Sequence, residues 1–187
     1  MKYRYSDKEI DLLLKNICIV CDTREQENKH IIEYFDKKKI NYRSEGLKVG
    51  DYTACIIANE ETAALGITRD TYFNDVVVIE RKANIEEIAN NFTNKADKLS
   101  RERLEREFLK IHKSGAKLIL IIENNRALED IINWNYNSKY NNKSLYSSLK
   151  SFEARFNINL KFIDKAYSGL EIYNTIKYYI REVLKWV

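Results

Sequence analysis

Hydrophobic and polar positions follow one another along the chain in blocks that predict a succession of strands and helices. Short apolar runs are typical of buried strands, and apolar residues that repeat every three or four positions are typical of helices. The predicted strands are 17–21, 47–49, 52–58, 76–81, 117–122 and 159–163. The predicted helices are 28–38, 85–92, 95–112, 128–134, 145–156 and a last one from about residue 170. Strands that alternate with helices predict an α/β layer fold with a mixed central sheet flanked by helices.

The chain is interpreted as a single domain over residues 1–187. It contains no proline and five glycines, and it shows neither a Gly/Ser-rich linker nor a repeat. A chain of this length can bury one core and is short for two. The least regular stretch, Asn59 to Asp75, places polar and small residues between two predicted strands. It fits either a long hairpin tip or a partly disordered loop.

The charge balance is mildly basic. The chain has 32 Lys and Arg against 28 Asp and Glu, a net charge of +4, which permits binding to nucleic acid without requiring it. No apolar run reaches the length of a membrane span, and the first residues lack the apolar stretch of a signal peptide. We therefore expect a cytoplasmic protein that does not enter a membrane.

Three cysteines make a poor disulfide framework and fit a reducing compartment. Cys18 and Cys21 have the spacing of half a zinc site. On the strand predicted at 17–21 they would point to opposite faces, and no second Cys or His pair follows them. We expect no structural zinc.

The most informative motif is the charged triplet Glu80-Arg81-Lys82, which follows the apolar run 76–79. On a strand, residues i and i+2 share a face, so Glu80 and Lys82 point the same way and Arg81 points to the other side. A carboxylate can hold Mg²⁺, and an ammonium group beside it can orient or acidify an attacking water. The spacing therefore suits hydrolysis of a phosphodiester bond.

Further carboxylates precede the triplet. Asp51 follows Gly50 at a predicted turn, and Asp22 and Glu25 follow the first strand. One carboxylate binds Mg²⁺ weakly, whereas two or three converging oxygens make a working site. Taken singly, each acid is better explained as an ordinary turn residue or a surface ion pair, because charged residues normally lie on the solvated surface.

Taken in order, the motifs at 22–25, 50–52 and 80–82 resemble those of the XPF nuclease family. The resemblance is clearest over residues 17–123, including the helix at 85–92, the Arg- and Glu-rich helix after it and the strand at 118–123. The C-terminal helical part, 124–187, resembles the family only loosely. The resemblance implies the nuclease domain alone, with a restriction-endonuclease-like core. A prokaryotic source, a virus such as a phage or a mobile element would account for such a branch.

The resemblance implies a metal-dependent endonuclease acting on branched DNA (flaps, forks, Holliday-type junctions or single-strand/double-strand junctions) in repair or recombination. Asp22, Asp51 and Glu80 are then the metal ligands, for Mg²⁺ or for Mn²⁺ as a substitute, and Glu25 completes the acidic cluster. The Asp51 and Glu80 carboxylates are expected to lie near one another without a compensating charge until a metal binds.

The same resemblance assigns the two basic residues of the triplet. Lys82 would position the nucleophilic water, and Arg81 would hold structure or a phosphate from the other face.

Three departures from the family pattern stand out. The Asp that follows the triplet in the family is Glu86 here, and 80 − 51 = 29 positions separate Asp51 from Glu80, a long insert. The tandem helix-hairpin-helix domain, which helps relatives to grip DNA and to pair subunits, appears in no part of the sequence.

Basic residues gather on the helix predicted at 95–112. Arg103 and Glu107 fall inside the arc of its apolar face, so Arg103 either contacts the acidic centre or the scissile phosphate, or is neutralised by Glu107 at i and i+4. The residues expected to contact DNA are Arg24, Lys95, Arg101, Arg103 and Arg106.

Other functions remain as alternatives. The chain could be a non-catalytic DNA-binding subunit of the same fold that partners an active nuclease, a protein-interaction domain, or a sequence-specific restriction enzyme. The presence of Asp51, Glu80 and Lys82 favours the catalyst over the subunit. The last helix carries an apolar stripe that fits either a homodimer interface or a cap on the core. Its members are Ile172, Ile176, Tyr179, Ile180, Val183, Leu184 and Val187.

Overall fold

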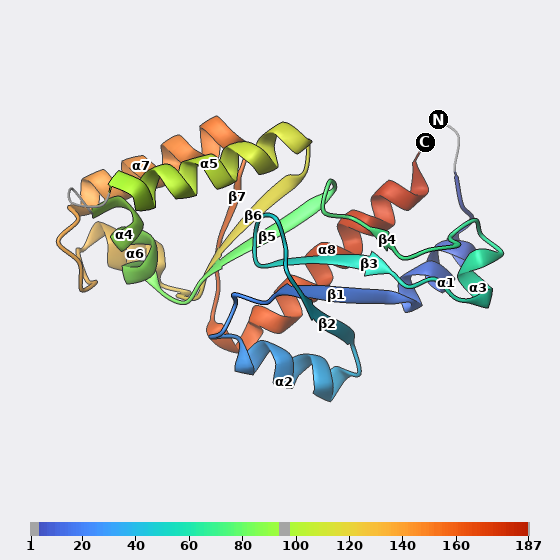
Figure 1. Cartoon of the computed structure of the whole chain (residues 1–187). Helices are drawn as coiled ribbons and strands as arrows, with labels where there is room; N and C mark the ends of the chain where they lie inside the picture. Colours follow the sequence, from blue (N-terminus) through green and yellow to red (C-terminus); the bar gives the residue numbers. More distant parts are fainter. Residues whose placement is uncertain (1–3, 94–97, 187) are drawn as a thin grey trace. The chain divides into compact units, whose positions relative to one another are not determined.

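The computed structural model describes residues 4–93 and 98–186 (Figure 1). The chain folds into two compact units. The first combines residues 1–78 with 169–187, and the second is the continuous segment 79–168. The first unit is therefore assembled from two separate segments of the chain.

The sheet of the first unit is mixed. Strand β1 (Ile17–Asp22) runs parallel to β2 (Asn41–Glu45) and antiparallel to β3 (Tyr52–Ile56), with Cys18 opposite Cys55. The short β4 (Thr71–Tyr72) pairs with β3. Every residue of β1 and β3 is buried, whereas β2 is largely exposed. The predicted mixture of strand directions is confirmed.

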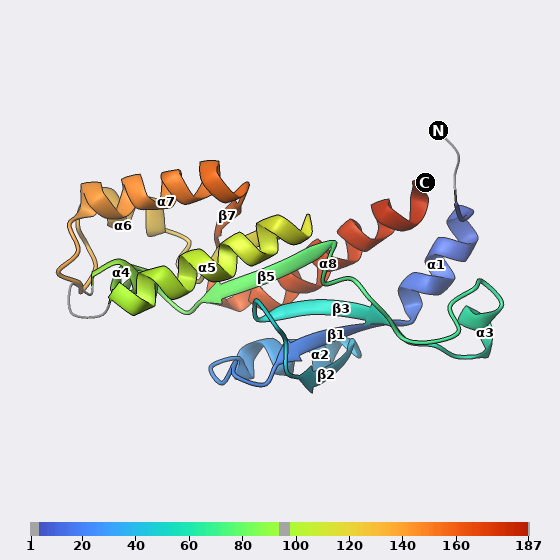
Figure 2. The same ribbon diagram turned by 45° about the horizontal axis from the view of Figure 1, so that its top comes forward.

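Four helices complete the first unit. They are α1 (Asp7–Lys15), α2 (Lys29–Lys38), α3 (Glu60–Ala63) and α8 (Ser168–Lys185). A capping box between Ser6 and Glu9 starts α1, because each residue satisfies a backbone N–H that the helix leaves open. Helix α2 lies along β1 and β2 (Figure 2).

The second unit has the strand order β5-β6-β7. Strand β5 (Val77–Lys82) begins in the first unit and ends in the second, and β6 (Lys117–Ile122) runs parallel to β7 (Asn159–Phe162). Its helices are α4 (Ile85–Thr93), α5 (Lys98–Ser114), α6 (Ala127–Ile132), α7 (Asn142–Phe156) and the 3₁₀ turn Lys165–Tyr167.

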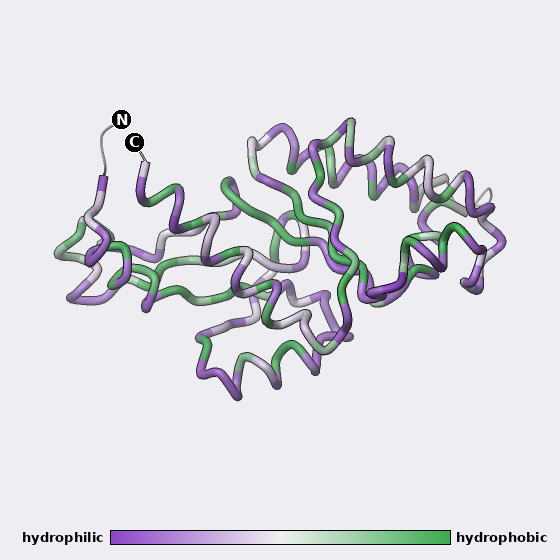
Figure 3. The backbone as a smooth tube through the Cα atoms, turned by 180° about the vertical axis from the view of Figure 1, so that it is seen from behind, coloured by the Kyte–Doolittle hydropathy of each residue, from purple (hydrophilic) through white to green (hydrophobic). Residues whose placement is uncertain are grey.

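Aromatic rings join three of these helices. Phe108 of α5 packs edge-to-face on Phe152 and Phe156 of α7, at centroid distances of 5.7 and 6.0 Å, and Phe92 of α4 meets Phe152 at 5.1 Å. Figures 1 and 2 accordingly show α5 and α7 beside one another. The hydropathy colouring in Figure 3 shows the apolar run of β6, as expected for a buried strand.

Most predicted elements are confirmed, with one clear error. The strand predicted at 47–49 is wrong: residues 46–51 form an irregular turn, and the strand lies at Asn41–Glu45 instead. The apolar Leu47 belongs to the core rather than to a strand, since it packs against Cys18, Val20 and Cys55. Of the helix predicted at 95–112, residues 95–97 lie outside the described residues.

The stretch from Asn59 to Asp75 is more ordered than expected, since it contains α3 and β4. Asp70 anchors it. Its carboxylate accepts hydrogen bonds from the Ala58 N–H at 2.9 Å and from Nη1 of Arg43 at 2.7 Å.

Two features bear on the last helix and on membranes. On α8, Ile172, Ile176, Ile180 and Leu184 are buried, while Val183 remains 43% exposed. Four of the seven residues of the apolar stripe are thus already covered by the chain itself, and Val187 lies outside the described residues. None of the described helices combines the length and the apolar character needed to cross a membrane.

Candidate active site

Asp22 ends β1 with a buried and fully hydrogen-bonded carboxylate. Its Oδ1 accepts from the N–H of Arg24 at 2.8 Å and from Nε of Arg24 at 2.7 Å. Its Oδ2 accepts from Nη2 of Arg24 at 3.0 Å and from the N–H of Leu47 at 2.7 Å. Burial raises the pKa of Asp22, but the hydrogen bonds from Arg24 and Leu47 outweigh it and hold the pKa below its usual range.

These contacts show that Asp22 stabilises the local structure. It ties the turn that follows β1 to the loop at Leu47. A metal ion could bind this carboxylate only by displacing hydrogen-bond donors that already fill both oxygens.

Asp51 lies beside the end of β1. The N–H of Asp22 donates to the carbonyl of Asp51 at 2.8 Å. Gly50, just before it, has φ 71°, a left-handed conformation that favours glycine, and Tyr52, just after it, is fully buried. The predicted turn at Gly50-Asp51 is confirmed, and the Asp51 residue is half-buried.

In the second unit, the end of β5 alternates as predicted. Nζ of Lys82 lies 2.8 Å from Oε1 of Glu80 and 3.3 Å from Oε1 of Glu87 on α4. The side chains of Lys82 and Glu80 are only 11% and 6% exposed. The expectation that Glu80 has no compensating charge is therefore wrong, because the strand that places Lys82 on the same face supplies one.

Besides Lys82, two further carboxylates act on Glu80. Burial raises the pKa of Glu80, Lys82 lowers it, and Glu107 of α5 and Glu87 raise it further, so the net shift is upward. These carboxylates are hard oxygen donors of the kind that Mg²⁺ prefers. The carboxylates around Glu80 are not grouped closely enough to hold a metal ion by themselves. Within residues 4–93 and 98–186, no group of three or more His, Cys, Asp or Glu side chains is placed to do so.

Arg81 points to the other face of β5, as the alternation of a strand requires. Its Nη1 lies 2.9 Å from Oε2 of Glu123, and the two side chains are 3% and 0% exposed. The N–H of Glu123 also donates to the carbonyl of Lys82 at 2.9 Å. The observed contact of Arg81 is thus structural, an ion pair that links β5 to the end of β6.

The arginines expected to contact DNA lie on the surface. Arg24 keeps a side chain that is 60% exposed although it clamps Asp22. On α5, Arg101, Arg103 and Arg106 are all exposed. Arg101 pairs with Glu105 at 3.1 Å, whereas Arg103 forms no ion pair among the described residues. Lys95 lies outside the described residues.

The expected place of Arg103 inside the apolar face of α5 is wrong. The buried residues of this helix are Leu104, Phe108 and Ile111, and Arg103 falls beside them on the exposed side. It is Glu107, half-buried, that acts on Glu80.

Glu25 and Glu86 accept hydrogen bonds from backbone N–H groups. The Glu25 N–H donates to the carbonyl of Asp22 at 3.1 Å, and its Oε1 accepts from the Glu27 N–H at 3.2 Å. Glu86 accepts from the N–H of Asn137 at 2.9 Å.

Sequence reasoning missed Glu87 and Glu123, whereas Glu107 was expected inside the apolar arc of its helix and is half-buried there. For Glu87 a signal existed, because it follows Asn84 by three residues, and its N–H does donate to Oδ1 of Asn84 at 2.8 Å. For Glu123 a weaker signal was its place directly after the most apolar strand.

Comparison with known proteins identifies the family. The model of the ERCC4 domain matches residues 21–174. Among solved structures, the chain is similar to XPF from Aeropyrum pernix, with 16% identity, a TM-score of 0.59 and coverage of 89% of this chain. It is also similar to XPF from Aeropyrum pernix in complex with DNA, with 15% identity, a TM-score of 0.54 and the same coverage.

The chain spans 66% of each of these solved chains, just under two thirds of their length. No curated protein sequence matches it. The likeness to the two structures confirms the predicted fold class, an α/β fold with a mixed sheet flanked by helices, as in these XPF structures. Because the ERCC4 model covers most of the sequence, the chain belongs to the ERCC4 domain family, and the resemblance to the XPF nucleases is confirmed.

Proposed function

We propose that this protein is a metal-dependent endonuclease that hydrolyses phosphodiester bonds in branched DNA. The observation that carries the proposal is the buried Glu80–Lys82 pair at the end of β5, in a chain of the ERCC4 domain family. A buried carboxylate with a raised pKa beside a charged partner is characteristic of functional sites. Burying charged groups lowers the stability of a fold unless they are well paired, so such groups are often found where function requires them.

The triplet gives each residue a task that follows from its chemistry. Lys82 can only donate hydrogen bonds, so it would orient the attacking water or hold a phosphate oxygen while Glu80 and Glu87 fix its ammonium group. Arg81 would keep β5 in place through its pair with Glu123.

Asp51 in the first unit and Glu80 in the second each carry oxygen donors of the kind that suits Mg²⁺, and Mn²⁺ would substitute for it. When bound, such an ion would polarise the phosphoryl oxygen and lower the pKa of a bound water. Asp22 fits this set less well, since its oxygens are filled by Arg24 and Leu47. We therefore assign Asp22 and Glu25 to the turn that holds Asp51 rather than to the metal itself.

DNA as the substrate is supported by the family and by one of the two similar structures, which is a complex with DNA. The exposed guanidinium groups of Arg24, Arg101, Arg103 and Arg106 would contact backbone phosphates, which bind a protein without reading sequence. Branched DNA is recognised by shape and backbone contacts, so such a surface suits it. A second copy of the chain would enlarge the footprint on DNA.

A cleavage assay over flaps, forks, four-way junctions and plain duplex, with Mg²⁺ or EDTA, tests the proposal. We expect Mg²⁺-dependent cuts in branched substrates, lost in Glu80→Gln. Glu129→Gln is the matched control, because it removes one carboxylate from an exposed ion pair with Arg126 in the same unit. Cleavage that persists in Glu80→Gln would refute the assignment.

One observation favours a second candidate, a non-catalytic DNA-binding subunit. No three metal-binding side chains are grouped within 4–93 and 98–186, as a preformed metal centre would require. The same assay separates the two candidates. A subunit would bind branched DNA without cutting any member of the panel, and would stimulate an active partner nuclease.

A further inference from the structure

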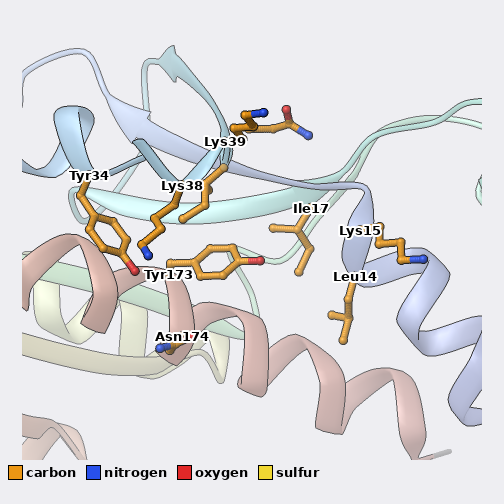
Figure 4. A pocket seen from close by; sticks show the side chains of 10 residues that line it. Leu14, Lys15, Ile17, Tyr34, Lys38, Lys39, Tyr173 and Asn174 are labelled. Atoms are coloured by element: carbon orange, nitrogen blue, oxygen red, sulfur yellow. The ribbon is translucent and has the colours of Figure 1, made fainter. Parts of the chain in front are cut away.

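A pocket in the first unit has no part in the nuclease assignment. It lies among α1, β1, α2, β2 and α8, with a volume of about 330 Å³ (Figure 4). This volume falls within the range of small-molecule sites. None of its lining residues is a candidate catalytic or DNA-binding residue, so its chemistry needs a separate explanation.

The charged residues that line this pocket are all basic. Lys15, Lys38 and Lys39 contribute three ammonium groups, and no Asp or Glu lines the pocket. Within the described residues none of the three lysines forms an ion pair. All three lysines are exposed, so their positive charge is open to solvent and would attract an anion.

Polar groups without internal partners accompany this charge. The hydroxyl groups of Tyr34 and Tyr173 and the side-chain amides of Asn41 and Asn174 line the pocket. In the part of the chain that the structure describes, none of these four side chains makes a hydrogen bond to another residue. They remain available to a ligand that needs both donors and acceptors.

The centre of the pocket lies between α2 and α8. Figure 4 shows Tyr34 and Lys38 projecting from α2 toward Tyr173 of α8, whereas Lys15 and Lys39 extend away from this centre and Asn174 lies on the lower side of α8 in this view. Tyr34 is held in place by α8, because a Cβ atom on Gly169 would lie 2.7 Å from its ring. Lys38 thus lies beside the ring of Tyr34, whose position is fixed by α8. Side chains held in place in this way lower the entropy that is lost when a ligand binds.

The C-terminal end of α2 explains only part of this charge. Lysines near a helix C-terminus interact favourably with the helix dipole, which accounts for Lys37 and Lys38 in general terms. Lys39 is a different case. It has φ 54°, the left-handed conformation that favours glycine at this cap, yet a lysine occupies the position. The dipole of α2 also says nothing about the unpaired amide of Asn174 on α8.

We infer that this pocket binds a nucleotide through its phosphate group. Lys38 would hold the phosphate by charge-assisted hydrogen bonds, with Lys15 and Lys39 adding long-range attraction. The ring faces of Tyr34 and Tyr173, together with the apolar side chains of Leu14 and Ile17, suit a planar base better than a bare anion. The nucleotide could be free or could be the phosphorylated end of a DNA strand, since both present the same chemistry.

Calorimetric titration of the full chain tests this inference with thymidine 5′-monophosphate and with thymidine. We expect the monophosphate to bind and thymidine to bind at least about tenfold more weakly, because hydrogen bonds to a charged group are lost. Lys38→Gln should weaken monophosphate binding by about tenfold. Lys37→Gln is the matched control, since it removes the same charge from the neighbouring exposed position outside the pocket, and its affinity should change by less than about twofold.

A second pair of ligands identifies the source of the nucleotide. In the presence of EDTA, which removes divalent metal ions, a short single strand with a 5′-phosphate is compared with the same strand bearing a 5′-hydroxyl. A preference for the phosphorylated strand that Lys38→Gln abolishes points to a strand end. Equal binding of the two strands, with tight binding of the monophosphate, points to a free nucleotide.

Three results would overturn the inference. Thymidine that binds as tightly as its monophosphate would exclude recognition of the phosphate. Equal losses in Lys37→Gln and Lys38→Gln would reduce the effect to general electrostatics. Absence of binding by the monophosphate, together with no preference for the 5′-phosphate, would leave the pocket without this ligand. None of these results depends on cleavage, so they leave the nuclease proposal untouched.

Discussion

Nζ of Lys82 lies 2.8 Å from Oε1 of Glu80, with both side chains buried. The same ammonium group is 3.3 Å from Glu87, so one buried cation serves two carboxylates. Removal of any member of this group changes both the charge balance of the second unit and the chemistry that β5 presents.

Glu80→Gln and Asp51→Asn should each reduce Mg²⁺-dependent cleavage by at least about a hundredfold, the scale expected for losing a group that acts on the transition state. Their effects on folding should differ. Glu80→Gln weakens the buried contact with Lys82 and should lower the free energy of unfolding by about 1–3 kcal/mol, whereas the half-buried Asp51 should matter less. Single-turnover cleavage and urea denaturation measure the two effects. Full activity in either variant would contradict the assignment.

Lys82→Met should lose turnover by about a hundredfold while keeping its affinity for Mn²⁺, because an ammonium group repels a cation and cannot be its ligand. Calorimetric titration with Mn²⁺ beside the cleavage assay checks this. A variant that cleaves normally but no longer binds Mn²⁺ would show the reverse division of labour.

Arg81→Met should destabilise the protein by about 3–5 kcal/mol, since it removes the guanidinium group that pairs with the buried carboxylate of Glu123. The double variant Arg81→Met/Glu123→Leu removes both charges and should recover most of the loss. Urea unfolding of the single and double variants gives the comparison. If the double variant were as unstable as the single one, the pair would not be the source of the effect.

Asp22 should make the stability of the protein sensitive to acid. Its pKa is lowered in the folded state, so its contribution is fully present above the unfolded value of about 3.9 and is lost as the pH falls through the folded value. Asp22→Asn should therefore be less stable than the parent at pH 7, with the gap closing in stronger acid. Urea unfolding across this range tests it, with the exposed Asp75→Asn as the control for lost charge. A gap that did not change with pH would rule out this origin.

Gly169→Ala should destabilise the first unit by about 1–3 kcal/mol, because the added methyl group would lie 2.7–2.8 Å from side-chain atoms of Tyr34. Gly46→Ala is the matched control, since the nearest atom there, Oγ1 of Thr23, is 4.0 Å away. Thermal unfolding of the two variants should separate them clearly. Equal stability would show that α2 and α8 can move apart at no cost.

The sequence predicted the fold well wherever local pattern determined structure. Strands β1 and β6 are almost wholly apolar, β5 begins with an apolar run before its charged triplet, and the bounds of all three lie within about a residue of those expected. Helix α1 was overlooked although its signal is present: Ser6 and Glu9 have the capping-box spacing before the apolar face formed by Ile10, Leu13 and Leu14.

Strand β2 carried no such signal. Its residues Asn41 to Glu45 are mostly exposed, so neither an apolar run nor alternation marks it, and only pairing with β1 makes it a strand. Contacts between elements that are distant in the sequence could not be predicted from local pattern either. The triplet predicted that Glu80 and Lys82 share a face, but Glu107 and Glu123 reach the two sides of β5 through tertiary folding alone.

The first unit, made of residues 1–78 and 169–187, has a consequence for how the chain is made. A ribosome releases the whole of 79–168 before α8 appears, so the second unit can fold while the first still lacks its last helix. During that interval the partners of Ile172, Ile176 and Ile180 stay open to water, and Tyr34 has no Gly169 against it. During synthesis, chaperones and proteases would encounter this partly folded first unit. A full-length chain that refolds from urea contains α8 from the start.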